Sequence, residues 1–351
     1  MTSQVALVGY GSAGRGIHAP LLAAAGMGPH LVVTANPQRV AQAAAELPDA
    51  RVVPDLDAAL AAGPDLVVLA SPSGVHAEQV VACVAAGVPV VVDKPLAVDG
   101  LQAGEVTRAA AAAGVPLTVF QNRRWDTENL TLARLLRDGV LGEVHRFERR
   151  WERWRPVPKE RWRELASWQQ GGGILLDLHT HLVDAAVRLF GPVEQVYAEV
   201  AAWTTPAEDE AFLALRHAGG TTSHLTASSV AAAPGPRTRV LGGVAAYVVT
   251  GFESEPVAFG GFDDLPGHCG WLVRGEQREP VPAADGGHGD FYPAVRAALA
   301  EPDPLARQAA MPVDPADAVH VLDVLDAARR SAATSGVVRL GIPVAGRQAA
   351  G

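Results

Sequence analysis

Hydrophobic and polar positions follow a repeating pattern along the first third of the chain. Short apolar runs cover residues 5–9, 31–35, 66–71, 88–93 and 116–121, and alanine-rich helical stretches lie near residues 13–25, 38–46, 75–86 and 100–113. Near-continuous apolar strands joined by helical crossovers are typical of a parallel sheet that is covered on both faces. The pattern predicts an α/β fold with a doubly wound Rossmann domain over residues 1–121.

The pattern changes beyond residue 121. Helical stretches near residues 126–138, 178–190 and 314–334 are separated by segments of alternating apolar and polar residues, such as EVHRFERRW, QVYAEVAAW, EAFLALRHA and TTSHLTASS. Strands with segregated helices indicate an α+β domain with a large open, mostly antiparallel or mixed sheet. We assign residues 122–343 to this second domain and expect residues 344–351 to form a disordered tail.

Composition narrows the class of protein. A chain of 351 residues suits two domains, and no apolar run approaches the ~18–20 residues that would cross a bilayer. The start, MTSQVALVGYGSAG, lacks the features of a secretory signal, so we expect a cytoplasmic protein. The net charge of −9 argues against a general nucleic-acid or membrane partner. The two cysteines, Cys83 and Cys269, are interpreted as small buried hydrophobic residues.

A glycine-rich motif follows the first apolar run. Gly9, Gly11 and Gly14 form G-x-G-x-x-G, with Ser12 and Ala13 inside it, where a strand should pass into a helix. In that context the glycines allow a tight turn, close approach of the backbone to a pyrophosphate, and close packing of helix on strand. The motif predicts dinucleotide binding through these five residues.

The end of the second apolar run bears on the choice of nicotinamide cofactor. An acidic residue there would bind the ribose 2′-hydroxyl of NAD, but the sequence has Thr34 and Asn36, and Arg39 follows. A missing carboxylate removes repulsion against a 2′-phosphate, and a guanidinium can pair with it. NADP is therefore favoured over NAD. Arg15 is a second candidate for this contact, or else a solvated cation in the first helical turn.

Two further loops belong to the same predicted edge of the parallel sheet. SPSGVH places Ser71, Pro72 and His76 where open α/β sheets bind ligands, although His76 is equally interpreted as an exposed residue of a helix start. In VVVDKPL, Lys94 ends another strand, and it is one of only two lysines, with Lys159, among 29 basic residues. A lysine there can stabilise the oxyanion of a substrate, or it is a surface residue before a proline.

The segment GGGILLDLHTHLVDAAVRLFGP, residues 171–192, crowds four polar residues into an apolar helix. Residues three and four apart share a helix face, so Asp177, His181 and Asp184 line one side and His179 points elsewhere. An H-x-H metal pair would need an extended backbone, which the helical period disfavours. The alternatives are an acid/base pair, a metal site, and a core helix whose polar residues are solvated; we predict no metal.

Two other segments hold candidate substrate contacts. FQNRRWDTENL offers Asn122, Arg124, Trp125 and Asp126, which can also be an N-cap and helix start. In RFERRWERWRPVPKERWRE, tryptophans alternate with arginines, but the acidic chain disfavours a nucleic-acid site. We expect this segment to be a loop covering the active site, in which Trp162 or Arg161 touches a polyol or packs on the surface.

Taken in order and spacing, the glycine motif, SPSGVH, DKP, FQNRRWD and GGGILLDLHTHLVD resemble the Gfo/Idh/MocA oxidoreductases over nearly the whole chain, to about residue 341. The forms DKP, NRRWD and RWRE are most similar to the NADP-dependent scyllo-inositol dehydrogenase branch. The resemblance implies a catalytic site that uses Lys94, Asp177 and His181. It also implies a cis bond before Pro95 and a homodimer or homotetramer.

Three residues depart from the family pattern. Asp93 stands where glutamate is usual, Gln121 where close relatives tend to carry histidine, and His179 where small residues or proline are usual. Gln121 and His179 would line or adjoin the substrate pocket, so they concern the identity of the substrate. We therefore expect an NADP-dependent oxidoreductase acting on a secondary hydroxyl of a cyclitol, polyol or sugar. The alternatives are a catalytically silent nucleotide-binding regulator of the same fold and a metal-dependent hydrolase.

Overall fold

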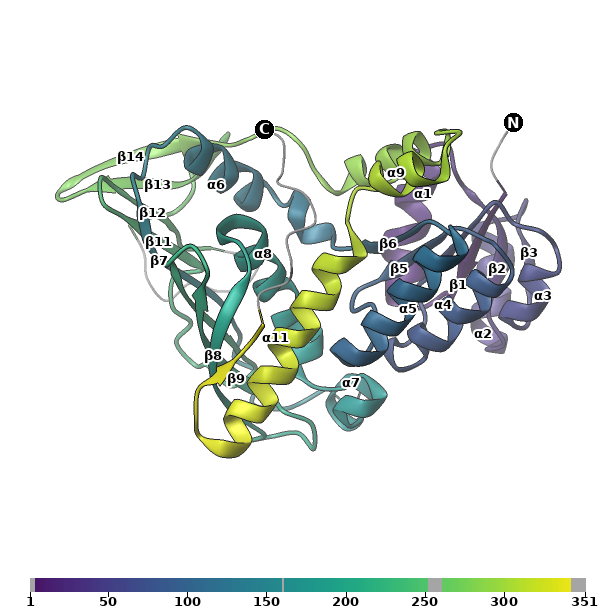
Figure 1. Ribbon diagram of the computed structural model, residues 1–351, viewed down its shortest axis with the longest axis horizontal. Coiled ribbons are helices and arrows are strands. Elements are labelled where there is room, and N and C mark those ends of the chain that lie inside the picture. The colour runs from purple at the N-terminus through teal and green to yellow at the C-terminus, as the bar shows by residue number, and fades with distance from the viewer. Residues whose placement is uncertain (1–3, 160, 252–260, 342–351) are drawn as a thin grey trace. The chain divides into compact units, whose positions relative to one another are not determined.

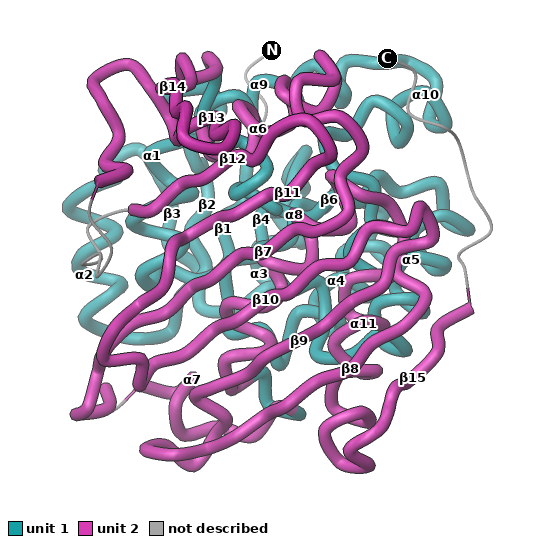
Figure 2. The backbone as a smooth tube through the Cα atoms, turned by 90° about the vertical axis from the view of Figure 1, so that its left-hand side faces the viewer, with its two compact units in different colours: residues 1–125, 169–171, 286–319 teal, residues 126–168, 172–285, 320–351 magenta. Residues whose placement is uncertain are grey.

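A computed structural model describes residues 4–159, 161–251 and 261–341, which form two compact units. Unit 1 comprises residues 4–125, 169–171 and 286–319, and unit 2 the remaining described residues (Figure 2). The predicted first domain ends at residue 121, and the predicted second domain includes residues 286–319, which the structure places in unit 1. The expected tail over residues 344–351 lies outside the described residues.

Unit 1 is built on a six-stranded sheet whose strands are all parallel. Its order is β3-β2-β1-β4-β5-β6. The central strands are fully buried, as their uninterrupted valines and leucines predict. This confirms the doubly wound domain. The strands are β1 (Val5–Val8), β2 (Pro29–Val33), β3 (Arg51–Val53), β4 (Leu66–Leu69), β5 (Val90–Asp93) and β6 (Leu117–Phe120).

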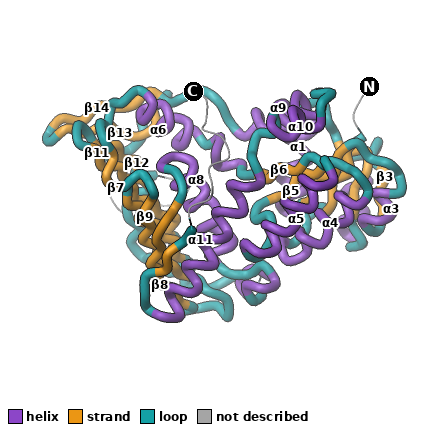
Figure 3. Tube along the Cα trace, in the orientation of Figure 1, coloured by secondary structure: helices purple, strands orange, loops and turns teal. Residues whose placement is uncertain are grey.

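Helices connect these strands (Figure 3). The ends of the helices follow local sequence rules. Asn36 and Asp99 accept backbone N–H groups at the starts of α2 and α5, and Gly114 ends α5 with φ of 64°. The helices are the π-helical segment η1 (Gly14–His18), α1 (Ala19–Ala24), α2 (Pro37–Glu46), α3 (Leu56–Leu60), the 3₁₀ turn η2 (Ser73–Val75), α4 (His76–Ala85), α5 (Gly100–Ala113) and the 3₁₀ turn η3 (Asn122–Trp125).

Residues 286–319 join unit 1 because they complete the edge of its sheet. They hold the 3₁₀ turn η6 (His288–Asp290), α9 (Phe291–Leu299) and α10 (Pro304–Ala309). The Gln308 side chain accepts from the Leu117 N–H at 2.9 Å and donates to the Leu117 carbonyl at 3.0 Å. Thr118 donates to the Val313 carbonyl at 2.8 Å. The amide of Gln308 therefore takes the place of a further strand beside β6.

Unit 2 is built on a nine-stranded sheet in the order β14-β13-β12-β11-β7-β10-β9-β8-β15 (Figure 2). All its described pairs are antiparallel except β7 with β10, so the expected mixed, mostly antiparallel sheet is confirmed. The strands are β7 (Val144–Glu152), β8 (Val193–Ala201), β9 (Glu210–His217), β10 (Thr222–Ser228), β11 (Thr238–Gly242), β12 (Ala246–Val249), β13 (His268–Arg274), β14 (Gln277–Pro282) and β15 (Val338–Arg339).

Helices pack on one face of this sheet, and Figure 2 looks onto the opposite face. His320 and Ser331 of the last helix accept the N–H groups of Val193 and Ala198 in β8. The helices are α6 (Thr127–Arg137), α7 (Trp162–Leu165), the π-helical segment η5 (Leu175–His179), α8 (Thr180–Phe190) and α11 (Pro315–Thr334). The 3₁₀ turn η4 spans Trp168–Gln170. Across the described ranges, no helix has both the length and the apolarity to traverse a bilayer.

Candidate active site

The glycine motif turns sharply at the carboxyl end of β1. Gly9 has φ of +93°, and a methyl group on it would lie 2.7 Å from the Ala70 carbonyl oxygen. A methyl group on Gly14 would overlap the Gly9 carbonyl oxygen, whereas one on Gly11 would fit without overlap. Gly9 and Gly14 are therefore required by the fold itself, while Gly11, followed by Ser12 and Ala13, leaves backbone open to a ligand, as dinucleotide binding needs.

Arg39 lies against this open part of the loop. A methyl group on Gly11 would be 3.7 Å from the Arg39 guanidinium carbon. Asn36 caps α2 by accepting the N–H groups of Gln38 and Arg39 at 3.0 and 3.1 Å, and Thr34 is buried. The loop after β2 and the first turn of α2 thus present a cation and no carboxylate beside the glycine motif. These residues fit a nucleotide that carries a 2′-phosphate.

Arg15, the second candidate for the 2′-phosphate, lies in another contact. Its guanidinium donates to Glu46 at the end of α2, with the shortest distance 2.6 Å, and the Tyr10 hydroxyl donates to the same carboxylate at 2.9 Å. Among the described residues, Arg15 therefore already has an anionic partner.

The loop after β4 is tied to the loop after β5. His76 is buried rather than exposed, and its ring nitrogens lie 2.8 Å from the Pro95 carbonyl oxygen and 3.0 Å from that of Ser71. Burial lowers the pKa of His76. The Ser71 hydroxyl donates to Gln79, and Pro72 precedes the helical turn η2. His76 therefore joins the loop after β4 to the loop after β5, at the edge of the sheet where a nucleotide is predicted to bind. The sequence did not reveal this role.

Lys94 directly follows β5, and the Lys94–Pro95 bond is cis, as the family resemblance implied. Its N–H donates to Asp93 Oδ1 at 2.9 Å, and the same oxygen lies 3.8 Å from His18 Nε2. His18 Nδ1 is 2.5 Å from the buried hydroxyl of Tyr292. Burial alone would raise the pKa of Asp93, but His18 and the charge of Lys94 outweigh it and hold that pKa low. His18 and Tyr292 were not predicted as site residues. The one feature of the sequence that could have indicated them is a polar side chain among apolar neighbours.

Gln121 directly follows β6, the neighbour of β5 in the sheet. Asp93 pairs in register with Phe120, so Lys94 and Gln121 follow at neighbouring positions of two parallel strands. Gln121 is 1% exposed, and neither its amide oxygen nor its nitrogen has a hydrogen-bond partner among the described residues. Burying an amide without hydrogen-bond partners costs folding free energy. A ligand group that bonded to the Gln121 amide would remove this cost, and Gln121 is one of the three residues that depart from the family pattern. Asn122, a predicted substrate contact, is buried beside it.

The other candidates from this segment have structural partners. Arg124 pairs with Asp317 at 2.9 Å, and Trp125 packs edge-on against Phe291 with ring centroids 5.5 Å apart. Asp126 occupies the N-cap position of α6 without a side-chain cap bond. Substrate contact by Arg124 and Trp125 stays a prediction.

The helix with the predicted acid/base pair lies in unit 2 and begins as the π-helical segment η5. π-helical turns are rare and occur frequently at functional sites; Asp177 lies within η5 and His181 in the first turn of α8. Asp177 Oδ1 is 3.4 Å from Arg163 Nε, and the His181 ring lies 5.7 Å from that of Trp151. Lys94 belongs to unit 1, and Asp177 and His181 belong to unit 2.

His179 points away from the pair, into the core. It is fully buried, its Nε2 lies 3.1 Å from the Ala211 carbonyl oxygen of β9, and burial lowers its pKa to about 4. It is therefore a neutral packing residue at ordinary pH. Within the described ranges, no group of three or more histidine, cysteine, aspartate or glutamate side chains is arranged to hold a metal ion.

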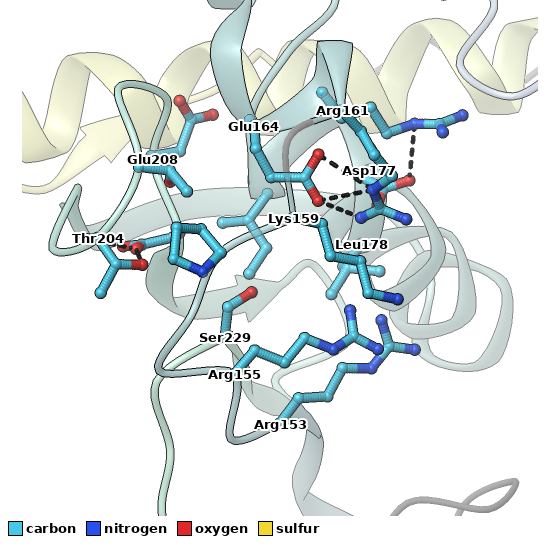
Figure 4. Close-up of a pocket in the computed structure, with 16 residues that line it drawn as sticks. Arg153, Arg155, Lys159, Arg161, Glu164, Asp177, Leu178, Thr204, Glu208 and Ser229 are labelled. Atoms are coloured by element: carbon cyan, nitrogen blue, oxygen red, sulfur yellow. Dashed lines mark hydrogen bonds and ion pairs between the residues drawn. The ribbon is translucent and has the colours of Figure 1, made fainter.

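A pocket with a cavity volume of about 50 Å³, open to solvent on one side, adjoins Asp177 in unit 2 (Figure 4). Arg161 lines it and pairs with Glu164, whereas Trp162 is absent from its lining and lies under the Arg163 guanidinium. The arginine-rich segment thus forms a pocket wall, which its five basic residues over positions 153–163 could have signalled. Sixteen residues line the pocket: Arg153, Arg155, Pro158, Lys159, Arg161, Arg163, Glu164, Gly173, Ile174, Asp177, Leu178, Thr204, Thr205, Glu208, Asp209 and Ser229.

Comparisons with known proteins match both halves of the chain. Residues 3–121 match the oxidoreductase family with an NAD-binding Rossmann fold, and residues 129–247 match the Gfo/Idh/MocA C-terminal domain. The chain is 30% identical over 350 residues to scyllo-inositol 2-dehydrogenase (NADP(+)) IolW of Bacillus subtilis, covering 94% of each chain. It is 34% identical over 343 residues to the uncharacterized oxidoreductase YdgJ of Escherichia coli, covering 94% of this chain and 96% of YdgJ.

A solved structure has the same fold. The structure titled "putative oxidoreductase yvaA" of Bacillus subtilis superposes with a TM-score of 0.85 at 28% identity, covering 97% of this chain and 99% of YvaA. The Rossmann unit, the mixed nine-stranded sheet and these matches together show that the chain belongs to the Gfo/Idh/MocA family of oxidoreductases.

Proposed function

We propose that the protein is an NADP-dependent dehydrogenase or reductase that acts on a secondary hydroxyl of a cyclitol, polyol or sugar. The observation that carries the proposal is the presence in one chain of Lys94 at the nucleotide edge of unit 1 and of Asp177 and His181 on the π-helical start in unit 2. A regulator without chemistry would not need all three. The named activity of the similar protein IolW supports the same substrate class.

Each residue has a chemical role in this proposal. When bound, NADP supplies the acceptor for the hydride. His181 removes the hydroxyl proton, since a neutral imidazole is a suitable base near neutral pH. Lys94 donates to the oxygen as negative charge develops on it, and the Asp93 and His76 contacts hold its backbone in place. Asp177, paired with Arg163, positions a neighbouring hydroxyl.

The preference for NADP rests on Arg39. Its guanidinium lies beside Gly11, and the loop after β2 carries no carboxylate. A 2′-phosphate would therefore meet a cation, and the 2′-hydroxyl of NAD would lack its usual acidic partner. Gly9, Gly11, Ser12, Ala13 and Gly14 would cradle the pyrophosphate at the start of the first helix.

One face of the nine-stranded sheet, which no helix of the described ranges covers, supports association between copies of the chain (Figure 2). The alternation of burial along β8, β9 and β12 places half-buried Tyr197, Phe212 and Val248 on the side away from the core. We therefore propose a homodimer or homotetramer, which light scattering of the pure protein tests.

The function is tested with a panel of inositols, sugars and sugar acids, with NADP and NAD in parallel, by following reduced-nicotinamide absorbance. We expect turnover with NADP, and we expect Lys94→Ala and His181→Ala to lose most of it while NADPH binding stays nearly unchanged. Unchanged turnover in both variants would refute the catalytic assignment. If the wild type binds NADPH tightly but turns over none of the compounds, the alternative of a nucleotide-binding regulator without catalytic activity would be favoured.

A further inference from the structure

Gln121, at the carboxyl edge of the parallel sheet, has a buried side chain without hydrogen-bond partners. It is 1% exposed, and neither its amide oxygen nor its amide nitrogen is bonded to another of the described residues. Its backbone, by contrast, is bonded on both sides. The Gln121 N–H donates to the Val119 carbonyl at 2.8 Å, and the Gln121 carbonyl accepts the Arg124 N–H at 3.0 Å. The turn after β6 therefore holds Gln121 by its main chain and leaves both amide atoms of the side chain to be satisfied.

A second glutamine beside the same strand shows what a structural amide does. Gln308 accepts the Leu117 N–H at 2.9 Å and donates to the Leu117 carbonyl at 3.0 Å, so both of its amide atoms are bonded. Leu117 begins β6, whereas Gln121 follows the other end of the strand. Of the two amides, only that of Gln308 recovers in the free protein the hydrogen bonds that it loses to water. An unpaired buried amide costs folding free energy, and such costs are expected at functional sites.

The position of Gln121 in the sheet favours contact with the substrate rather than with the phosphates of the nucleotide. The glycine motif follows β1, and β4 and β5 lie between β1 and β6. Three strand spacings, roughly 14 Å, therefore separate Gln121 from that motif. Lys94, which is proposed to bind the reacting oxygen, occupies the neighbouring position after β5. Lys94 is half-buried and Gln121 is buried, so the amide lies beside the reacting oxygen and is the more shielded from water.

The chemistry of the side chain indicates which ligand group it can bind. A glutamine amide offers a donor, its nitrogen, and an acceptor, its oxygen. A carboxylate or phosphate group only accepts, so it would leave the amide oxygen unpaired. An ammonium group only donates, so it would leave the amide nitrogen unpaired. Hydroxyl groups both donate and accept, and they therefore suit both atoms of the Gln121 amide.

We propose that Gln121 determines specificity by binding a hydroxyl group on the carbon next to the reacting carbon. The inference rests on the proposed function and deepens it: Lys94 binds the reacting oxygen, and Gln121 reads the oxygen on the adjacent carbon. The enzyme should therefore prefer substrates that carry two oxygens on neighbouring carbons, as cyclitols and sugars do. A compound without the second hydroxyl would leave the buried amide unpaired, which is the basis of strong discrimination between substrates.

The kinetic test compares two ketones that differ in one hydroxyl, 2-hydroxycyclohexanone and cyclohexanone, in their reduction by NADPH. Each has a single carbonyl, so the reacting carbon is unambiguous. We expect the full-length wild type to have a kcat/KM at least about tenfold higher for 2-hydroxycyclohexanone. In Gln121→Met, which replaces the amide by an apolar group of similar size, the two kcat/KM values should lie within about twofold of each other. KM for NADPH should be unchanged.

Two kinetic results would overturn the inference and leave the proposed function standing. The first is the same ratio of kcat/KM values in wild type and in Gln121→Met. The second is a KM for NADPH that rises in Gln121→Met by the same factor with both ketones. That second result would place the amide against the carboxamide of the nicotinamide instead of the substrate.

Thermal unfolding without ligands gives a readout that separates this role from a structural one. Gln121→Met should have a Tm no lower than that of the wild type, because it replaces an unpaired buried amide by an apolar group. Gln308→Met is the matched control and should lower Tm, because it removes both bonds to Leu117. A loss of Tm in Gln121→Met as large as that in Gln308→Met would overturn the inference, since it would show that the Gln121 amide is bonded in the free protein.

Absence of turnover with both ketones and with the panel of inositols and sugars would count against the proposed function instead. Ligand-induced stabilisation then decides the inference separately. In the presence of NADP, scyllo-inositol should raise the Tm of the wild type, since a ligand that binds the native state stabilises it, and it should raise that of Gln121→Met less. An equal rise in both proteins, or no rise in the wild type, would overturn the assignment of Gln121.

Discussion

A buried ion-pair cluster in unit 2 gives the sharpest test of how the fold supports the site. Glu128 in α6 lies 3.2 Å from Arg149 and 3.2 Å from Arg237, and it accepts the Thr238 hydroxyl. The side chains of Glu128, Arg149 and Arg237 are at most 8% exposed. Arg237 also lies over the ring of Trp151, 5.2 Å from its centre. The cluster thus supports the aromatic ring that contacts His181.

Glu128→Gln should destabilise the protein strongly. The substitution keeps the shape of the side chain but leaves two buried guanidinium groups facing a neutral amide. Removing one partner of a buried ion pair costs about 3–5 kcal/mol of unfolding free energy. Glutamine keeps one oxygen that can accept a hydrogen bond, so we expect a loss of about 3 kcal/mol. For a folding unit of 150–250 residues, that loss lowers Tm by about 6–12 °C.

Urea and thermal unfolding followed by circular dichroism measure this change. Glu276→Gln, in the exposed turn between β13 and β14, is the control and should leave Tm within about 1 °C, since surface changes are small. The double variant with Arg237→Gln should lose less than the sum of the two single losses, because the residues act as one network. Additive losses, or a drop in Tm no larger than that of the control, would refute the network argument.

The pH dependence of the unfolding free energy of the same variant tests the direction in which the pKa of Glu128 is shifted. Burial alone would raise the pKa of Glu128, but the charges of Arg149 and Arg237 outweigh it and hold the pKa below its unfolded value of about 4.3. The stabilisation is therefore complete above that pH and is lost as pH falls through the folded pKa. The difference in unfolding free energy between wild type and Glu128→Gln should shrink in acid, and a constant difference would contradict this assignment.

Two other predictions concern the nucleotide edge and the core. Arg39→Gln should raise KM for NADP by about tenfold or more and have little effect on KM for NAD, because it removes a charge-assisted contact with the 2′-phosphate. Steady-state kinetics with both cofactors measure this, and equal effects on the two KM values would exclude Arg39 from recognition of the 2′-phosphate. His179, with a pKa of about 4, should make unfolding free energy fall by up to about 3 kcal/mol as pH drops from about 6.5 to 4, since only the unfolded chain gains the proton. Urea titrations should give a flatter pH dependence for His179→Gln, and an equal slope would count against it.

The residues of the candidate site differ in how far sequence could specify them. Gly9 and Gly14 were predicted because their spacing reflects a local turn, and the structure adds that each would clash with nearby backbone if it carried a side chain. His18 and Tyr292, 274 positions apart, were not predicted because only folding places one against the other. His76 was left open between two interpretations, since burial between two loops has no local signature.

The sequence by itself determined the periodic elements. The five apolar runs of the first domain correspond to β1, β2, β4, β5 and β6, and the predicted helix over residues 100–113 is α5. These elements follow from contacts between near neighbours in sequence, where apolar spacing and capping residues decide the structure. The three-residue strand β3 and the strands β11–β14 went unpredicted, because short or partly polar segments become strands only through their sheet partners.

Only the tertiary structure decided which distant segments complete each unit and each site. Gln308 closes the edge of a sheet that ends 188 positions earlier at Phe120, and it draws residues 286–319 into unit 1. The pocket beside Asp177 likewise joins the loop over residues 153–163 to the start of a helix and to residues 204–209. Such contacts depend on burial and charge that are shared between remote positions, and the order of residues along the chain does not record them.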